Sequence, residues 1–261
     1  AFGQAGTLTS LVMIFMLFHF NIVSFKATYI IVGVVACLGA LAVIRFPHMV
    51  EGELRQVAPE RERIVLRRDY RYYYALVFLD GARQQIFFSF GLWVLVNRFG
   101  LGVSRISLVL IAITLGCMAT VTRLGRAIDR HGERRMLSIF NLAYIVAIAG
   151  YALANSVWLA CVFYFIYAII SPVSGIGAST YLRKVAVPQE LAPSLAMGQT
   201  IMHTTAIAIP VAAGLILNFV SYRVPFLVAC AFALAASVVI CTEGLLIAPI
   251  RKTGLKSICQ K

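Results

Sequence analysis

Eight mostly apolar stretches follow one another along the chain, and they constrain its fold more than any other feature. They cover residues 6–25, 27–45, 72–97, 104–122, 136–154, 157–181, 195–218 and 224–247. A helix of about 20 apolar residues crosses the roughly 30 Å hydrocarbon core of a bilayer. None of the stretches alternates apolar and polar residues as a β-barrel strand does. The sequence therefore predicts an all-α, multi-pass transmembrane bundle of about eight spans.

The overall composition supports an integral membrane protein. Hydrophobic residues make up 61% of the chain and charged residues 13%, whereas a soluble domain is roughly 45–50% apolar. The net charge of +13 could indicate binding to nucleic acid. The basic residues instead form short clusters between apolar runs, which is typical of membrane-protein loops. We expect a lipid bilayer as the partner, and no nucleic acid.

The positive charges also predict an orientation. If the eight spans alternate across the membrane, 18 Lys and Arg residues fall on one side and four on the other. Cytoplasmic loops carry such an excess. The cytoplasmic segments would be 45–71, 123–135, 183–194 and 251–261. The C-terminus is therefore predicted to be cytoplasmic, in a protein of the cell membrane or inner membrane.

One connection, residues 46–71, is much longer than the others and mixes both charge signs. We interpret it as a cytoplasmic linker, and an amphipathic helix lying on the inner leaflet is one form it could take. It separates residues 1–45, with two helices, from residues 72–250, with six. Residues 251–261 form a basic tail.

The segment from Gly125 to Arg135, between the fourth and fifth spans, combines two glycines with closely spaced charges. The glycines permit a tight turn between antiparallel helices. Asp129 could accept hydrogen bonds from free amides at a helix start and pair with a nearby arginine. A solvated loop on the positive side of the membrane would have a similar composition, so both interpretations stay open.

This segment resembles the conserved cytoplasmic-loop motif of the major facilitator superfamily, G-x-x-x-D-R-x-G-R/K-R/K. The matching residues are Gly125, Asp129, Arg130, Gly132, Arg134 and Arg135. Glu133 departs from the motif, because an acid stands where a base is usual, and this would weaken one ion pair of the loop. The resemblance implies a gating role for these residues, as an inner-side latch that pairs when the cytoplasmic face is closed.

In that family the motif follows the second helix and, often more weakly, the eighth. By this resemblance, residues 1–45 correspond to helices five and six, 46–71 to the central loop, and 72–250 to the C-terminal half. The first four helices of the same protein would be missing partners. The chain opens with Ala1 rather than Met, as we expect of an N-terminally incomplete chain.

The third span contains an unusually polar stretch. Asp80, Arg83 and Gln84 lie at positions i, i+3 and i+4 and so share one helix face. Placing Asp and Arg deep in a membrane costs ~2.5–3.5 kcal/mol each, so these residues should face an interior cavity. They would form a substrate or proton site, with Arg83 holding an anionic group or poising Asp80. The alternative is an ion pair that locks the bundle.

Two other spans carry features of interest. His203, in the seventh, could relay protons because histidine titrates near physiological pH, although a lone histidine often only bonds neighbouring helices. In the sixth, small residues at Ser171, Gly175 and Ser179 predict close helix packing. Pro172 predicts a kink there.

The resemblance implies a secondary active transporter that moves a small molecule by alternating access, as an antiporter or symporter, with proton-coupled efflux as one form. A receptor or scaffold without transport activity and a membrane-embedded enzyme are the alternatives. The sequence has no HExxH, GxSxG or GxxxxGK[ST] pattern, and its four His and six Cys lack metal-ligand spacing. We therefore expect no catalytic residue, no metal and no cofactor.

Overall fold

The computed structural model describes the backbone of residues 2–44, 66–217 and 221–258, and all regular structure in these ranges is helical. The elements are α1 (Phe2–His19), α2 (Phe25–Ile44), the short 3₁₀ helix η2 (Arg68–Tyr70), α4 (Arg71–Asn97), α5 (Val103–His131), α6 (Glu133–Leu153), α7 (Val157–Ile170), α8 (Pro172–Val185), α9 (Pro188–Leu217) and α10 (Arg223–Ile258). A helix stands at each predicted span, with α7 and α8 sharing one. Most of the predicted linker, 46–65, lies outside the described residues.

Six helices in the described ranges are long and apolar enough to cross a membrane, when α7 and α8 are taken together. Helix α1 is apolar but shorter than the others. Helix α4 has 27 residues, and its polar stretch at Asp80 and Arg83 lowers its hydropathy. The packing of α4 inside the bundle explains how such a helix can be accommodated. The prediction of an all-α membrane bundle is confirmed.

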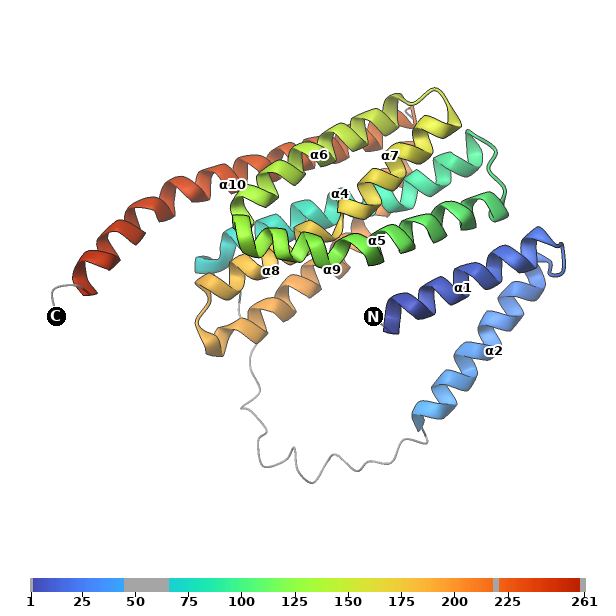
Figure 1. Ribbon diagram of the computed structural model, residues 1–261, viewed down its shortest axis with the longest axis horizontal. Coiled ribbons are helices and arrows are strands. Elements are labelled where there is room, and N and C mark those ends of the chain that lie inside the picture. Colours follow the sequence, from blue (N-terminus) through green and yellow to red (C-terminus); the bar gives the residue numbers. More distant parts are fainter. Residues whose placement is uncertain (1, 45–65, 218–220, 259–261) are drawn as a thin grey trace.

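Helix α4 runs through the middle of the bundle and packs against α8, α9 and α10. Helix α6 packs against α7, α8 and α10, and α1 lies along α5 (Figure 1). Gly81 is one point of close approach between α4 and α9, because an added Cβ would lie 2.7 Å from Thr205 Oγ1. A glycine at this position therefore lets the two backbones come together.

The core of the bundle is aromatic. Phe87 of α4 is fully buried and lies against Tyr164 and Tyr167 of α7, with ring centroids 5.3 Å and 3.8 Å away. Tyr151 of α6 and Phe226 of α10 complete the contact. This packing fixes the position of α4, and Arg83 lies about one turn before Phe87 on the same helix.

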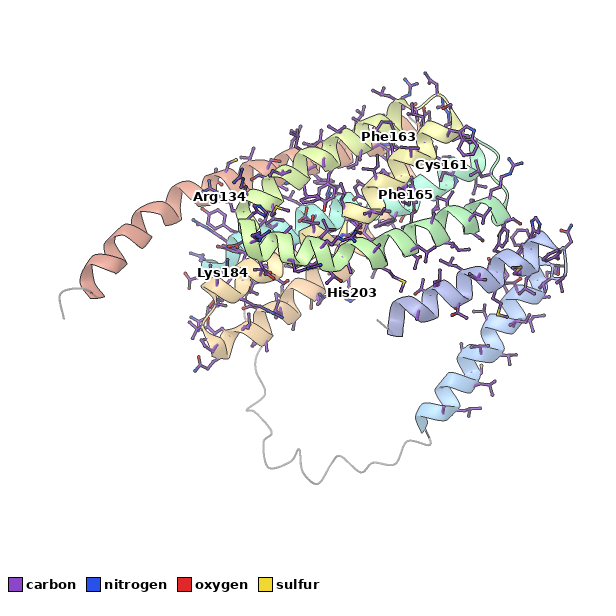
Figure 2. All side chains as sticks on the ribbon, viewed as in Figure 1. Arg134, Cys161, Phe163, Phe165, Lys184 and His203 are labelled. Carbon is purple, nitrogen blue, oxygen red and sulfur yellow. The ribbon has the colours of Figure 1, made fainter. Side chains whose placement is uncertain are left out.

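The helix connections alternate between two ends of the bundle. The start of α4, the α5–α6 turn and the α8–α9 turn lie at one end, which we call the basic end because it carries Arg71, Arg134 and Lys184. Figure 2 shows Arg134 and Lys184 at this end, with Cys161 and Phe163 toward the other. The alternation on which the charge argument depends is therefore present from α4 to α10.

The glycine-containing turn differs from the prediction. Helix α5 continues to His131, so Gly125 lies inside a helix and only Gly132 forms the turn. Gly132 has φ +84°, a conformation that side chains with a Cβ rarely adopt. Asp129 consequently lies in the last turn of α5, where carbonyls rather than amides are free. The prediction that it caps a helix start is wrong.

The predicted kink at Pro172 is present, since α7 ends at Ile170 and α8 begins at Pro172. The close packing predicted through Gly175 is not present in the described part of the chain, because a Cβ added there meets none of these residues within 4 Å. The close contact is instead at Gly177 of the same helix, where an added Cβ would lie 2.6 Å from the Leu137 side chain of α6. At the C-terminus, α10 continues to Ile258 and takes in most of the predicted basic tail.

Candidate functional site

Arg83 and Asp80 form a buried ion pair on α4. The Arg83 side chain is 1% exposed, and its Nη2 donates to Asp80 Oδ1 at 3.0 Å. The same Nη2 donates to Ser174 Oγ of α8 at 2.9 Å. The i, i+3 spacing brings the two charges together, as the sequence predicts, and the fold adds a hydroxyl from a helix 91 positions later.

Two tyrosines hold the guanidinium of Arg83 from the other side. Its Cζ lies 3.7 Å from the ring centroid of Tyr144 of α6 and 5.6 Å from that of Tyr167 of α7. A cation over an aromatic face is stabilised by the ring quadrupole, more so when water is excluded. Arg83 is therefore held by four helices: its own, α6, α7 and α8.

Some hydrogen-bond donors of Arg83 have no acceptor among the described residues. Its Nε and Nη1 are buried and have no hydrogen-bond acceptor among the described residues, and the same holds for the Tyr167 hydroxyl. A guanidinium has five N–H donors in a planar fork. Only the Nη2 end of that fork is used here, so donor capacity remains beside the ion pair.

The Arg83 site is connected to the break between α7 and α8. Pro172 has no N–H, so the Ala168 carbonyl loses its helical partner, and Ser171 Oγ donates to that carbonyl at 3.0 Å. The Tyr144 hydroxyl donates to the Ile170 carbonyl at 2.7 Å and accepts from Ser174 Oγ at 3.2 Å. The kink is thus stabilised by the same tyrosine that covers Arg83.

A cavity of ≈ 110 Å³ lies beside the ion pair, between α4, α8 and α9. Asp80, Gln84 and Ser174 line it, whereas Arg83 is not among its lining residues. The full lining is Tyr73, Val77, Asp80, Gln84, Ser174, Gly175, Ala178, Ser179, Leu195, Gly198, Gln199 and Met202. The carboxyl group faces the cavity, and the guanidinium stands behind it.

The structure brings Asp80, Arg83 and Gln84 together and leaves His203 apart. His203 lies on an exposed face of α9, at the lower margin of the bundle in Figure 2, and is not among the lining residues of the cavity. Sequence reasoning missed Ser174 and Tyr144 as partners of Arg83. Ser174 had a signal, as a hydroxyl beside Pro172 in an apolar span, but Tyr144 resembles any other aromatic residue of a membrane helix.

The motif residues lie at the basic end, and none of them lines the cavity. They are Gly125, Asp129, Arg130 and Gly132, followed by Arg134 and Arg135 in the first turn of α6. In the described residues, Asp129 is exposed and makes no hydrogen bond or ion pair. Glu133 instead pairs with Lys184 of α8, with Nζ 2.5 Å from Oε2. The residue that departs from the motif thus makes a cross-helix contact at this turn.

A second cluster of polar contacts lies at the basic end and joins η2 to α9. Glu190 forms an ion pair with Arg67 and accepts a hydrogen bond from the Tyr70 hydroxyl at 2.7 Å. The Tyr70 oxygen also accepts from the Val187 amide at 3.3 Å. The hydrogen bond to Glu190, together with burial, raises the pKa of Tyr70. These contacts tie the start of α4 to the α8–α9 turn.

Comparison with known proteins gives the family. A family model described as Major Facilitator Superfamily matches residues 73–254, from the first turn of α4 into α10. The chain belongs to the major facilitator superfamily. No curated protein sequence matches it. The resemblance carried by the Gly125–Arg135 segment is confirmed, since that segment lies inside the matched region.

Membership in the major facilitator superfamily gives the coarse function. The superfamily is one of membrane transporters that move small molecules, not of enzymes. The apolar helices of this member embed it in a lipid bilayer as a multi-pass protein. Within that frame, the buried pair and its cavity are the candidate transport site.

Proposed function

We propose that this chain carries the transport site of a secondary active transporter that moves a small molecule by alternating access, with Asp80 as the group that binds and releases a proton. One observation carries the proposal: the acidic residue Asp80 lines a cavity between α4, α8 and α9 while a buried arginine stands behind it. Charged residues at membrane depth are costly and commonly mark ion or substrate pathways.

Arg83 acts in this proposal as a fixed positive charge. A guanidinium does not lose its proton in proteins, and contacts from Ser174 and Tyr144 restrict this one. Asp80 is then the variable partner, because its carboxyl can be either charged or neutral. The alternative role as a mere structural lock does not account for the carboxyl facing a cavity.

We further propose an orientation and a domain organisation. The basic end faces the cytoplasm, in keeping with the positive-inside rule, and the C-terminus lies on that side. Residues 1–45 belong to the N-terminal half, 46–71 form the linker, 72–250 form the C-terminal half and 251–261 the basic tail. The motif turn around Gly132 and the Tyr70–Glu190 contact lie together at this end and act as its gate.

The test uses the full-length protein in proteoliposomes with an imposed pH gradient. Labelled small carboxylates, amines and sugars are supplied on either side, so that both uptake and efflux are measured. Asp80→Asn is expected to reduce gradient-driven accumulation at least about tenfold, because an amide cannot exchange the proton. Wild-type accumulation in this variant, at equal membrane abundance, would refute the assignment of Asp80.

Two neighbouring glutamines provide a matched control. Gln84 lines the cavity, whereas Gln85 is not among its lining residues. We expect Gln84→Leu to lower the apparent affinity for the transported probe several-fold and Gln85→Leu to leave it within about twofold. Equal effects of the two substitutions would mean that the cavity beside Asp80 is not where the substrate binds.

A further inference from the structure

We infer that the transported substrate is a small organic anion that binds to Arg83 while a proton binds to Asp80. This inference rests on the proposed function and names its substrate class. It follows from three features of the site: the charge balance of the buried pair, the unused donors of Arg83 and the position of Asp80 between Arg83 and the cavity.

The charge balance limits the site to one negative partner at a time. Arg83 is 1% exposed and carries a permanent positive charge. A buried charge without a partner is strongly unfavourable, and Asp80 is the anion that neutralises it here. If Asp80 takes up a proton, the guanidinium needs another anion. A neutral or cationic substrate could not supply one.

The other groups that face the pair cannot take the place of that anion. They are the phenols of Tyr144 (α6) and Tyr167 (α7) and the Ser174 hydroxyl (α8), which contact Arg83, and the Tyr73 phenol (α4) and the Gln199 amide (α9), which line the cavity. In the described part of α10, the thiol of Cys230 donates to the Ile145 carbonyl instead of facing the pair. No second carboxylate from the described residues lies against Arg83.

The unused donors of Arg83 can complete a two-oxygen contact once Asp80 leaves Nη2, because Nε and Nη1 each share an edge of the guanidinium with Nη2. Nη2 serves both Asp80 and Ser174, which leaves the N–H groups of Nε and Nη1 without an acceptor among the described residues. An arginine fork binds a carboxylate, phosphate or sulfonate through two parallel hydrogen bonds. The buried Tyr167 hydroxyl, also unpaired in this part of the chain, is a further donor next to the guanidinium.

Asp80 separates the cavity from Arg83, and this position couples the two binding events. An anion entering the cavity reaches the guanidinium only if the Asp80 carboxyl turns away. Once displaced, that carboxyl has lost its cation and takes a proton. One proton and one monoanion therefore bind together and leave the net charge of the site unchanged. The stack on Tyr144 keeps Arg83 in place during the exchange.

The lining of the cavity also offers polar groups to the anion. The amides of Gln84 and Gln199 and the Ser179 hydroxyl provide hydrogen-bonding groups for the rest of the ligand. This favours a hydroxy- or oxo-substituted acid over an acid with an entirely apolar tail.

The test measures binding and transport of methanesulfonate and C2–C4 hydroxycarboxylates, with their uncharged amides and ammonium analogues as matched controls. Binding is read from the thermal stabilisation of purified full-length protein. For the wild type, the apparent affinity for anions should fall about tenfold per pH unit once Asp80 is charged, since one proton is bound with each anion. Amides and ammonium analogues should not bind.

Substitutions separate this inference from the proposed function. Asp80→Asn mimics the protonated carboxyl, so it should bind anions independently of pH and keep at least half of the anion counterflow while losing proton-driven accumulation. Arg83→Gln should lose anion binding at least tenfold, and Arg83→Lys, which keeps the charge but not the fork, should lose nearly as much.

Two results would overturn the substrate assignment while leaving a transport site at Asp80 intact. One is stabilisation by amides or ammonium analogues as strong as that by anions. The other is failure of every anion in the panel to stabilise Asp80→Asn although that variant is folded and has lost proton-driven accumulation of another probe.

Discussion

Helices α4 and α9 both carry polar side chains deep in an apolar span, and the bundle treats them in opposite ways. Arg83 of α4 is 1% exposed and contacts residues of α6, α7 and α8. His203 of α9 is exposed and makes no hydrogen bond or ion pair with the described residues. A polar residue in an apolar span thus becomes a buried charge with partners on several helices in α4, and an exposed imidazole without a partner among the described residues in α9.

The comparison teaches that position on a helix, more than polarity, decides the role of a membrane-embedded residue. Arg83 lies on the face of α4 that meets three other helices. The packing of Phe87 against Tyr164 and Tyr167, one turn further along α4, holds this face of the helix toward α7. His203 lies on the face of α9 turned away from α4, and its ring does not line the cavity. Direct proton exchange between His203 and Asp80 is therefore not available in this conformation.

The largest effect is expected from breaking the buried pair. Arg83→Gln leaves Asp80 without its cation, and the loss of one partner of a buried pair costs about 3–5 kcal/mol. We expect this reduction in the free energy of unfolding, measured in mixed micelles with increasing dodecyl sulfate. The double variant Arg83→Gln with Asp80→Asn should recover more than half of the loss, because no charge is then buried. Additive losses would contradict the pairing.

A smaller effect is expected at the α7–α8 kink. Tyr144→Phe keeps the ring over Arg83 but removes the hydroxyl that bonds the Ile170 carbonyl and Ser174. Tyr151→Phe is the matched control, since Tyr151 also lies on α6 and donates to a carbonyl, that of Gly91, at 2.6 Å. Each should lose about 1 kcal/mol of stability.

Transport should distinguish these two tyrosine variants. Only Tyr144 joins Arg83 to the break between α7 and α8, so Tyr144→Phe is expected to slow the transport of a bound anion about tenfold with little change in binding. Tyr151→Phe should transport at the wild-type rate. If both variants are slowed equally, the kink contacts have no specific part in the transport cycle.

The smallest effect is expected on α9. His203→Gln removes an exposed group without a described partner, so the free energy of unfolding should change by no more than about 0.5 kcal/mol. The dependence of transport on pH should also stay as in the wild type, because Asp80 and not His203 exchanges the proton. A flattened pH profile in His203→Gln would reverse the comparison and assign the relay to α9.

Much of the fold could be read from the chain itself. The apolar stretches predicted the membrane spans, with α7 and α8 together as one, because a membrane helix satisfies its backbone hydrogen bonds locally and needs only length and hydropathy. The polar face of Asp80, Arg83 and Gln84 was also predictable, since it depends on spacing within one helix. The family followed from the Gly125–Arg135 segment and the matched region.

Other features depended on contacts between distant segments. Ser174 lies 91 positions from Arg83, and no local pattern marks Tyr144 as the residue that covers it. The sequence predicted a tight turn formed by two glycines, whereas only Gly132 lies in it, because the sequence does not reveal how far α5 stays helical. The Glu133–Lys184 pair likewise joins two turns that are close only in the folded bundle.

The sequence by itself determined the membrane helices, their alternation and the shared face of Asp80 and Arg83 on α4, because hydropathy and helical spacing act over a few turns of one segment. Only the tertiary structure decided that Asp80 faces the cavity while Arg83 stands behind it, and that His203 stays outside. Those outcomes depend on which helix faces meet, and side-chain packing among α4, α6, α7, α8 and α9 selects them.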